Sequence, residues 1–116
     1  MPSSATISPS RTLFTLINVF VVEPANQRRL VELLSRATAT FVRHAPGFIS
    51  ASLHRSLDGT KVTMYAQWRS AEDYQAMRES SARLPYFEQA LAIAKFDPGI
   101  YEVVETYSGT VAPADT

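Results

Sequence analysis

Nine consecutive residues, Phe14-Thr-Leu-Ile-Asn-Val-Phe-Val-Val22, decide how this chain folds. The run is rich in β-branched and aromatic residues, which favours a β-strand, and successive side chains of a strand point to opposite faces. One face carries Phe14, Leu16, Asn18, Phe20 and Val22, and the other carries Ile17, Val19 and Val21. An antiparallel sheet with helices on one side normally has polar residues on its open side. Both faces of this strand are apolar instead.

The second apolar face predicts a homodimer. A chain of 116 residues has room for one domain, whose helices can cover only one face of its sheet. Most soluble oligomers are symmetric homodimers, so a second copy is the simplest cover for the other face. The alternative is a monomer with an exposed patch, which is disfavoured for a patch of this size.

Outward from this strand, the pattern alternates between helices and strands. Pro24 suits a first helical position, and apolar residues recur at helical spacing from Leu30 to Phe41, through about residue 44. Pro46-Gly47 ends that helix, and Asp58-Gly59 predicts a hairpin. We expect the further strands at residues 48–55, 61–69 and 100–107.

Two shorter helices are predicted before the last strand. Ser70-Ala-Glu-Asp73 resembles a capping box and begins a helix through about Glu79. Pro85 begins another, with Phe87, Leu91 and Ala94 on one side, and Asp97-Pro98-Gly99 then turns the chain into the last strand. The order is β-α-β-β-α-β, an α+β, ferredoxin-like fold with a four-stranded antiparallel sheet. We expect the domain at residues 11–109 and flexible tails at 1–10 and 110–116, which are small and polar.

The composition narrows the classes of function. The 11 basic side chains balance 11 acidic ones, so the formal net charge is zero and neither a nucleic acid nor an anionic membrane is an expected partner. Without cysteine the chain has no disulfide or thiol nucleophile, and its 2 histidines have no carboxylate cluster beside them to make a metal site. Residues 12–22 are too short to span a bilayer and lack a cleavage site, so we expect a cytoplasmic protein.

Asn18 and Trp68 are the candidate functional residues. Asn18 is polar on the face that the helices should cover, where an amide must find hydrogen-bond partners. It either bonds neighbouring backbone or faces a ligand. Trp68 follows Val62, Met64 and Ala66 by twos and would lie in the same layer, as a core anchor or as part of a pocket.

Other polar and aromatic residues have less specific patterns. Tyr74 and Met77, on the first short helix, are either packing residues or part of a pocket between helices and sheet. His54 follows Phe48, Ser50 and Ser52 by twos, which places it with them on the side facing a partner subunit or near the rim of that side.

Three stretches resemble the antibiotic biosynthesis monooxygenase family. They are Pro46-Gly-Phe-Ile-Ser-Ala-Ser52, Asp58-Gly59 and Tyr65-Ala-Gln-Trp-Arg-Ser-Ala-Glu-Asp-Tyr74. The likeness runs from about residue 13 to 107 and is strongest to the cofactor-independent anthrone oxygenases of aromatic polyketide pathways. It implies a dimeric α/β-barrel with one pocket per subunit.

The resemblance also implies site residues. In the anthrone oxygenases these are a first-strand asparagine, a third-strand asparagine and the tryptophan that ends the third strand. Asn18 and Trp68 match the first and last, whereas the middle position falls at Met64. Tyr74 matches a tyrosine that some members have.

Two positions depart from the pattern of these enzymes. Leu53 stands where they have a second tyrosine, and Glu88 stands near the position of an arginine. We expect Asn18 and Trp68 to be catalytic. The residues expected to bind substrate are Tyr74, Met64, Leu53, Phe20 and Met77.

The reaction implied by the resemblance is the oxidation of an anthrone-type aromatic polyketide to a quinone by O2, without cofactor or metal. Haem-degrading members of the family use an axial histidine, and the corresponding position falls near Leu91, so haem is not expected. The alternatives are a polyketide cyclase on the same fold, or a non-catalytic dimer that binds small molecules.

Overall fold

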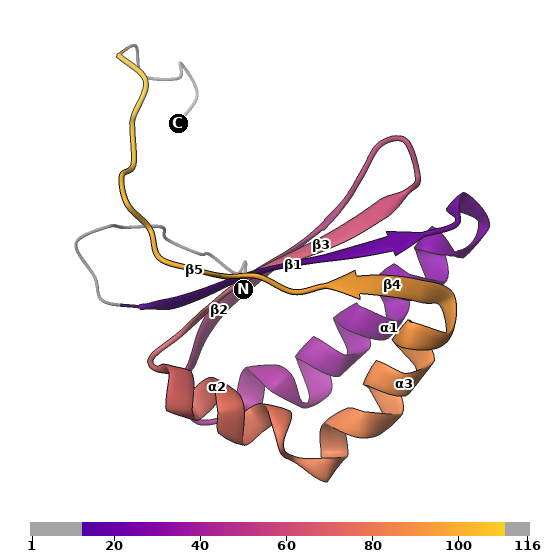
Figure 1. The fold of residues 1–116 in the computed structure, drawn as a ribbon, viewed down its shortest axis with the longest axis horizontal. Helices are drawn as coiled ribbons and strands as arrows, with labels where there is room; N and C mark the ends of the chain where they lie inside the picture. Colours follow the sequence, from indigo (N-terminus) through magenta and orange to yellow (C-terminus); the bar gives the residue numbers. More distant parts are fainter. Residues whose placement is uncertain (1–12, 111–116) are drawn as a thin grey trace.

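The computed structural model describes residues 13–110 (Figure 1). The predicted tails, 1–10 and 110–116, lie outside this part of the chain except for Thr110. The strands are β1 (Phe14–Val22), β2 (Phe48–Arg55), β3 (Lys61–Trp68), β4 (Ala94–Asp97) and β5 (Ile100–Tyr101). The helices are α1 (Gln27–Thr40), α2 (Ala71–Arg78) and α3 (Leu84–Ile93), with 3₁₀ turns η1 (Pro24–Asn26), η2 (Val42–His44) and η3 (Ser81–Arg83).

The sheet has the order β2-β3-β1-β4, with antiparallel neighbours, and β5 also pairs with β1. All three helices lie on one side of it (Figure 1). This confirms the predicted ferredoxin-like order and the division of the second helical region into two pieces. Among the described residues, no helix is long and apolar enough to cross a membrane.

The last strand differs from its prediction at both ends. It begins at Ala94, which the apolar spacing assigns to a helix, and only Ile100–Tyr101 of the predicted 100–107 is strand. Tyr101 pairs with Thr15, one residue after the start of β1, so the chain beyond it runs past the end of its neighbour. Residues 102–110 therefore have no adjacent strand in the described part of the chain and extend away from the sheet (Figure 1).

β4 and β5 are two pieces of one edge strand. Asp97 pairs with Val19 and Ile100 with Leu16, so both pieces keep the same register along β1. Pro98 interrupts the ladder between them because it has no backbone N–H to donate. The interruption lies opposite Asn18.

A bulge in β2 overturns the predicted placement of Phe48. Phe48 pairs with Trp68 while Ser50 pairs with Gln67, so Ile49 is an extra residue between them. Counting by twos fails across such an insertion because the strand gains one residue over its partner. Phe48 therefore lies on the helix side with Trp68, and not with Ser50 and His54 on the open side.

The buried core is divided into two clusters along β1. One cluster contains Phe20, Val22, Leu30, Val62 and Ala90. The other contains Leu16, Ala66, Trp68 and Met77. Asn18 lies between Leu16 and Phe20 on the same face, where neither cluster fills the space.

Candidate active site

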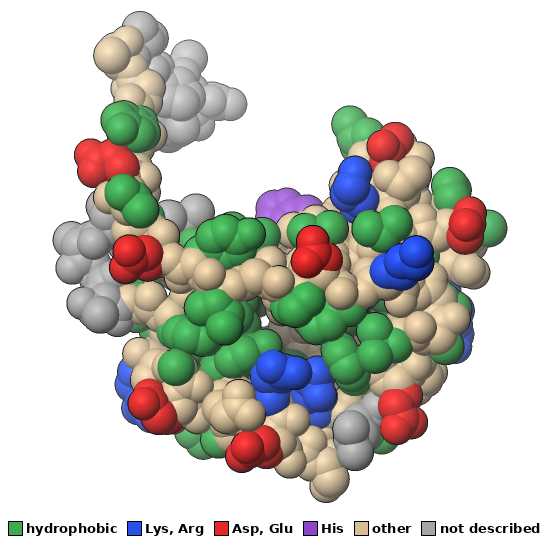
Figure 2. Space-filling view, viewed as in Figure 1, with side chains coloured by type: hydrophobic (Ala, Val, Ile, Leu, Met, Phe, Trp, Pro, Cys, Tyr) green, Lys and Arg blue, Asp and Glu red, His purple; other side chains and the backbone are tan. Residues whose placement is uncertain are grey.

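A cavity of about 120 Å³ lies between the sheet and the helices, where the two core clusters meet. Its lining is mostly aliphatic and aromatic, and it opens through a hollow in the surface bordered by basic side chains (Figure 2). Six of the predicted site residues line it: Asn18, Trp68, Tyr74, Met64, Phe20 and Met77. Leu53 does not. It packs against the Phe20 cluster and borders a separate groove beside α1, so the structure does not bring it together with the other six.

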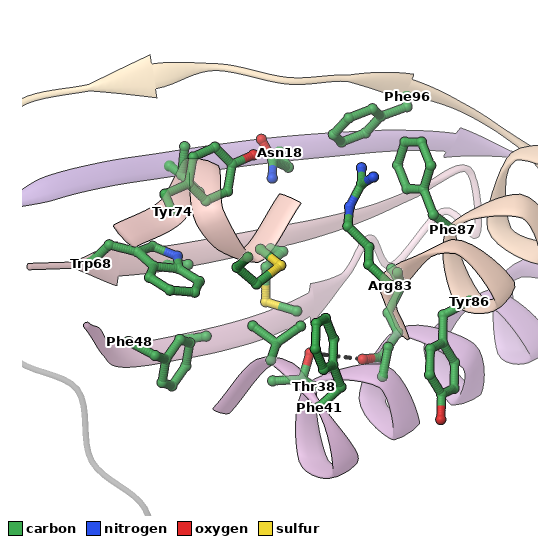
Figure 3. A pocket seen from close by; sticks show the side chains of 18 of the residues that line it. Asn18, Thr38, Phe41, Phe48, Trp68, Tyr74, Arg83, Tyr86, Phe87 and Phe96 are labelled. Atoms are coloured by element: carbon green, nitrogen blue, oxygen red, sulfur yellow. Dashed lines mark hydrogen bonds between the residues drawn. The ribbon is translucent and has the colours of Figure 1, made fainter. Parts of the chain in front are cut away.

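The Asn18 amide is held by the interrupted edge strand. The Gly99 backbone N–H donates to Asn18 Oδ1 at 3.3 Å, while Gly99 O accepts from the Ile17 N–H at 3.0 Å. Figure 3 shows the amide oxygen turned towards the edge strand and the amide nitrogen towards the cavity. No described residue accepts a hydrogen bond from Asn18 Nδ2. The main chain therefore binds the oxygen end of the amide, as one interpretation of the sequence predicts, and leaves the nitrogen end as a donor.

Met64 lies directly opposite Asn18 across β1 and β3. The resemblance places an asparagine at this position in the anthrone oxygenases. In those enzymes two amide side chains would therefore be neighbours. A thioether donates no hydrogen bond. Asn18 Nδ2 is therefore the amide donor at this point of the cavity.

Trp68 and Tyr74 form one end of the cavity. Trp68 is 1% exposed, and its ring packs edge-on against Phe48 at 5.4 Å and Tyr74 at 5.7 Å between centroids. Its indole nitrogen has no hydrogen-bond partner among the described residues and lies on the side of the ring towards the cavity, and the Tyr74 hydroxyl is turned towards Asn18 (Figure 3). Three polar groups thus converge in an otherwise apolar space.

The predicted cap of α2 positions Tyr74 and Met77. The Asp73 N–H donates to Ser70 Oγ at 3.1 Å, and Asp73 Oδ2 accepts from Ser70 Oγ at 3.0 Å and Arg69 Nε at 2.8 Å. The two hydrogen bonds that its carboxylate accepts, that from Arg69 foremost and then that from Ser70, lower the pKa of Asp73. Gly47, with φ of +86°, packs against Asp73 so closely that a Cβ would overlap it. The cap and this glycine together fix the start of α2 against the start of β2.

Sequence reasoning missed several residues of the cavity. The predicted face of Phe48 is wrong, and the apolar pattern of α1 marks Phe41 only as a packing residue. Arg83, in η3, lines the cavity with its guanidinium carbon 3.8 Å from the centroid of the Phe87 ring. No local pattern marks it, because its position depends on the turn between α2 and α3. Among residues 13–110, no cluster of three histidine or acidic side chains could hold a metal ion.

Comparison with known proteins identifies the family. The model of the family described as antibiotic biosynthesis monooxygenase matches residues 13–92. The chain belongs to this family. Tetracenomycin-F1 monooxygenase of Streptomyces glaucescens is 44% identical over 106 residues, which cover 91% of this chain and 95% of that protein. The chain is accordingly a monooxygenase of the antibiotic biosynthesis monooxygenase family.

Solved structures of low sequence identity share the fold. A mutant of SnoaB, a cofactor-independent oxygenase from Streptomyces nogalater, superposes with a TM-score of 0.74 at 22% identity, covering 83% of this chain and 97% of SnoaB. Rv0793 from Mycobacterium tuberculosis superposes with a TM-score of 0.71 at 21% identity, covering 84% of this chain and 100% of that protein.

Proposed function

We propose that this monooxygenase oxidises an anthrone-type aromatic polyketide to a quinone with O2 and without a cofactor. The observation that carries the proposal is Asn18 Nδ2, which has no acceptor among the described residues and is aimed into an apolar cavity that Trp68 and Tyr74 also border. The 44% identity to a tetracenomycin F1 monooxygenase and the fold shared with a cofactor-independent oxygenase support it.

The proposed reaction requires no redox cofactor because the substrate itself is the reductant. An anthrone loses a proton from its methylene carbon, and the negative charge spreads onto the carbonyl oxygen opposite. The carbanion transfers electrons to O2, and a C–O bond forms to give a hydroperoxide. Cleavage of the O–O bond, with loss of the remaining C–H proton, releases one water and leaves a second carbonyl. The sum is anthrone plus O2 giving quinone plus water.

Asn18 stabilises the charge that develops in the first step. Its Nδ2 donates a hydrogen bond to the carbonyl oxygen, and the Gly99 N–H keeps the amide in the orientation that this requires. A preorganised donor is most effective in a dry site, where losing one such bond costs about 100-fold or more in kcat. Trp68 shapes the pocket and offers its indole N–H, and Tyr74 positions a substrate hydroxyl.

The size of the cavity determines how the substrate enters. At about 120 Å³ it is comparable with the roughly 150 Å³ apolar cavity that accepts benzene, so one aromatic ring fits without rearrangement. The remaining rings of a fused substrate extend towards the opening.

Quinone formation from dithranol, a simple anthrone, tests the reaction. Purified protein treated with a chelator should consume O2 and form the quinone faster than the buffer blank. A polyketide cyclase would consume no O2, so an oxygen electrode separates that alternative. A rate equal to the blank would refute the oxygenase proposal.

The role of Asn18 is tested by Asn18→Ala, which should lower kcat with dithranol about 100-fold. Asn26→Ala is the matched control, since Asn26 precedes α1, makes no side-chain cap bond and does not line the cavity. Unchanged turnover in Asn18→Ala would remove the amide from the mechanism.

We also propose that the enzyme is a homodimer joined through the open face of the sheet. On that face β1 carries three apolar residues beside Thr15, namely Ile17, Val19 and Val21, and Val21 remains 45% exposed. Further exposed apolar side chains, Ile100, Tyr101, Val104 and Tyr107, follow in the edge strand and the segment that extends from it. A second copy would cover these surfaces together.

A further inference from the structure

Two arginines beside the cavity, Arg78 and Arg83, make no ion pair with any carboxylate in residues 13–110. Arg83 lines the cavity and is partly buried, and the Arg78 guanidinium lies 5.8 Å from the centroid of the Tyr74 ring. Arg69, by contrast, forms an ion pair with Asp73. Neither Arg78 nor Arg83 has such a pair with any described carboxylate.

The charge of Arg83 is poorly compensated as a result. Burial lowers its pKa, and repulsion from Arg78 lowers it further. A guanidinium taken partly out of water normally acquires an anionic partner. Here the face of the guanidinium rests on Phe87, which is a favourable contact but uses none of its N–H donors.

The stacking on Phe87 leaves the edge of the guanidinium free. Its N–H groups lie in the plane of the group, and no described residue accepts a hydrogen bond from them. In Figure 3 the guanidinium projects beside Phe87 on the same side of the cavity as Asn18 and Phe96. Two parallel N–H bonds from such an edge match the two oxygens of a carboxylate better than a single phenolate oxygen.

We propose that Arg83 anchors a carboxylate carried by the aromatic substrate, so that the enzyme selects acidic polycyclic compounds over neutral ones. The ring to be oxidised lies against Asn18 and Trp68, and the acidic end lies towards the opening at Arg83. Arg78 adds to the positive field there. The inference rests on the proposed function only in taking the cavity as the aromatic binding site, and it is tested by binding alone.

Two fluorescent probes of nearly equal shape provide the test: anthracene-2-carboxylate and its neutral amide, anthracene-2-carboxamide. The wild-type protein should bind the carboxylate at least about tenfold more tightly, since a charge-assisted bond contributes more than a neutral one. Arg83→Gln should abolish this preference, and Arg83→Lys should retain part of it, because a lysine keeps the charge without the planar edge. Arg28→Gln, an equal change of charge at an exposed position of α1, should leave the preference intact.

Equal affinity of the wild type for both probes, or no binding of either up to about 1 mM, would overturn the proposal. So would a preference that survives Arg83→Gln. Dithranol carries no carboxylate, so its turnover reports on the oxygenase proposal separately. A preference for the carboxylate without dithranol oxidation would support the anion site while refuting the reaction.

Discussion

Trp68 combines a packing role with a polar group, and two substitutions separate them. Trp68→Phe keeps an aromatic ring against Phe48 and Tyr74 but removes the indole N–H. We expect it to lower kcat/KM for dithranol about tenfold, the equivalent of one lost hydrogen bond of ~1.4 kcal/mol. Trp68→Ala should in addition lower the free energy of unfolding by about 3–5 kcal/mol. Steady-state kinetics and urea unfolding measure the two effects, and wild-type kinetics in Trp68→Phe would leave Trp68 a packing role only.

Asp58 makes the hairpin between β2 and β3 sensitive to acid. Hydrogen bonds from Thr60 and Ser56 to its carboxylate lower its pKa from 3.8 to about 2. Because the folded-state pKa is the lower one, the stabilisation is present above about pH 4 and is lost as the pH falls towards 2. Asp58→Asn should therefore lower the melting temperature at pH 6, and this difference should vanish near pH 2.

Asp97→Asn is the control for this pH dependence, since it removes the same charge at an exposed position of β4. If both substitutions change the melting temperature in the same way at each pH, the hydrogen bonds of the turn are not the cause.

At the scale of elements, the position of α2 depends on one glycine outside it. Gly47 and Gly59 both have positive φ, +86° and +83°, but they differ in their surroundings. A Cβ at Gly47 would overlap Asp73, whereas at Gly59 the nearest atom, Pro24 Cβ, is 3.3 Å away. Gly59→Ala should cost about 1–2 kcal/mol for the left-handed backbone alone.

Gly47→Ala should cost more than Gly59→Ala by at least about 1 kcal/mol, because it strains the backbone and also displaces the cap of α2. It should reduce dithranol turnover as well, since α2 carries Tyr74 and Met77 to the cavity. Equal unfolding free energies for the two variants would contradict this account of the contact between Gly47 and Asp73.

Two irregularities in the strands determine how side chains of the site are oriented. The extra residue in β2 turns Phe48 towards Trp68, and the break at Pro98 frees the Gly99 N–H for Asn18. Each is a local irregularity at one edge of the sheet, which is where bulges and prolines are tolerated.

At the scale of the whole molecule, the proposed dimer is the main prediction. Sedimentation at about 10 µM should show two copies of the chain. Val21→Glu, which puts a charge on the open face, should shift the protein towards monomer. Leu57→Glu is the control, because Leu57 is fully exposed in the hairpin turn and belongs to no strand of the sheet. A monomeric wild type at this concentration would refute the dimer.

The sequence alone determined the order of elements, the Asp58-Gly59 hairpin, the Ser70 cap and the placement of Asn18 and Trp68 in one layer. These features depend on the alternation of side chains and on turn and cap residues, all of which act over a few neighbouring positions. Only the tertiary structure decided that the core is divided into two clusters with a cavity between them. It also decided that Arg83 and Phe48 line this cavity and that Leu53 does not. The orientation of Asn18 is the clearest case, since it is set by Gly99, 81 residues further along the chain. Contacts between residues so distant in sequence leave no periodic signal, because they exist only once the strands have paired.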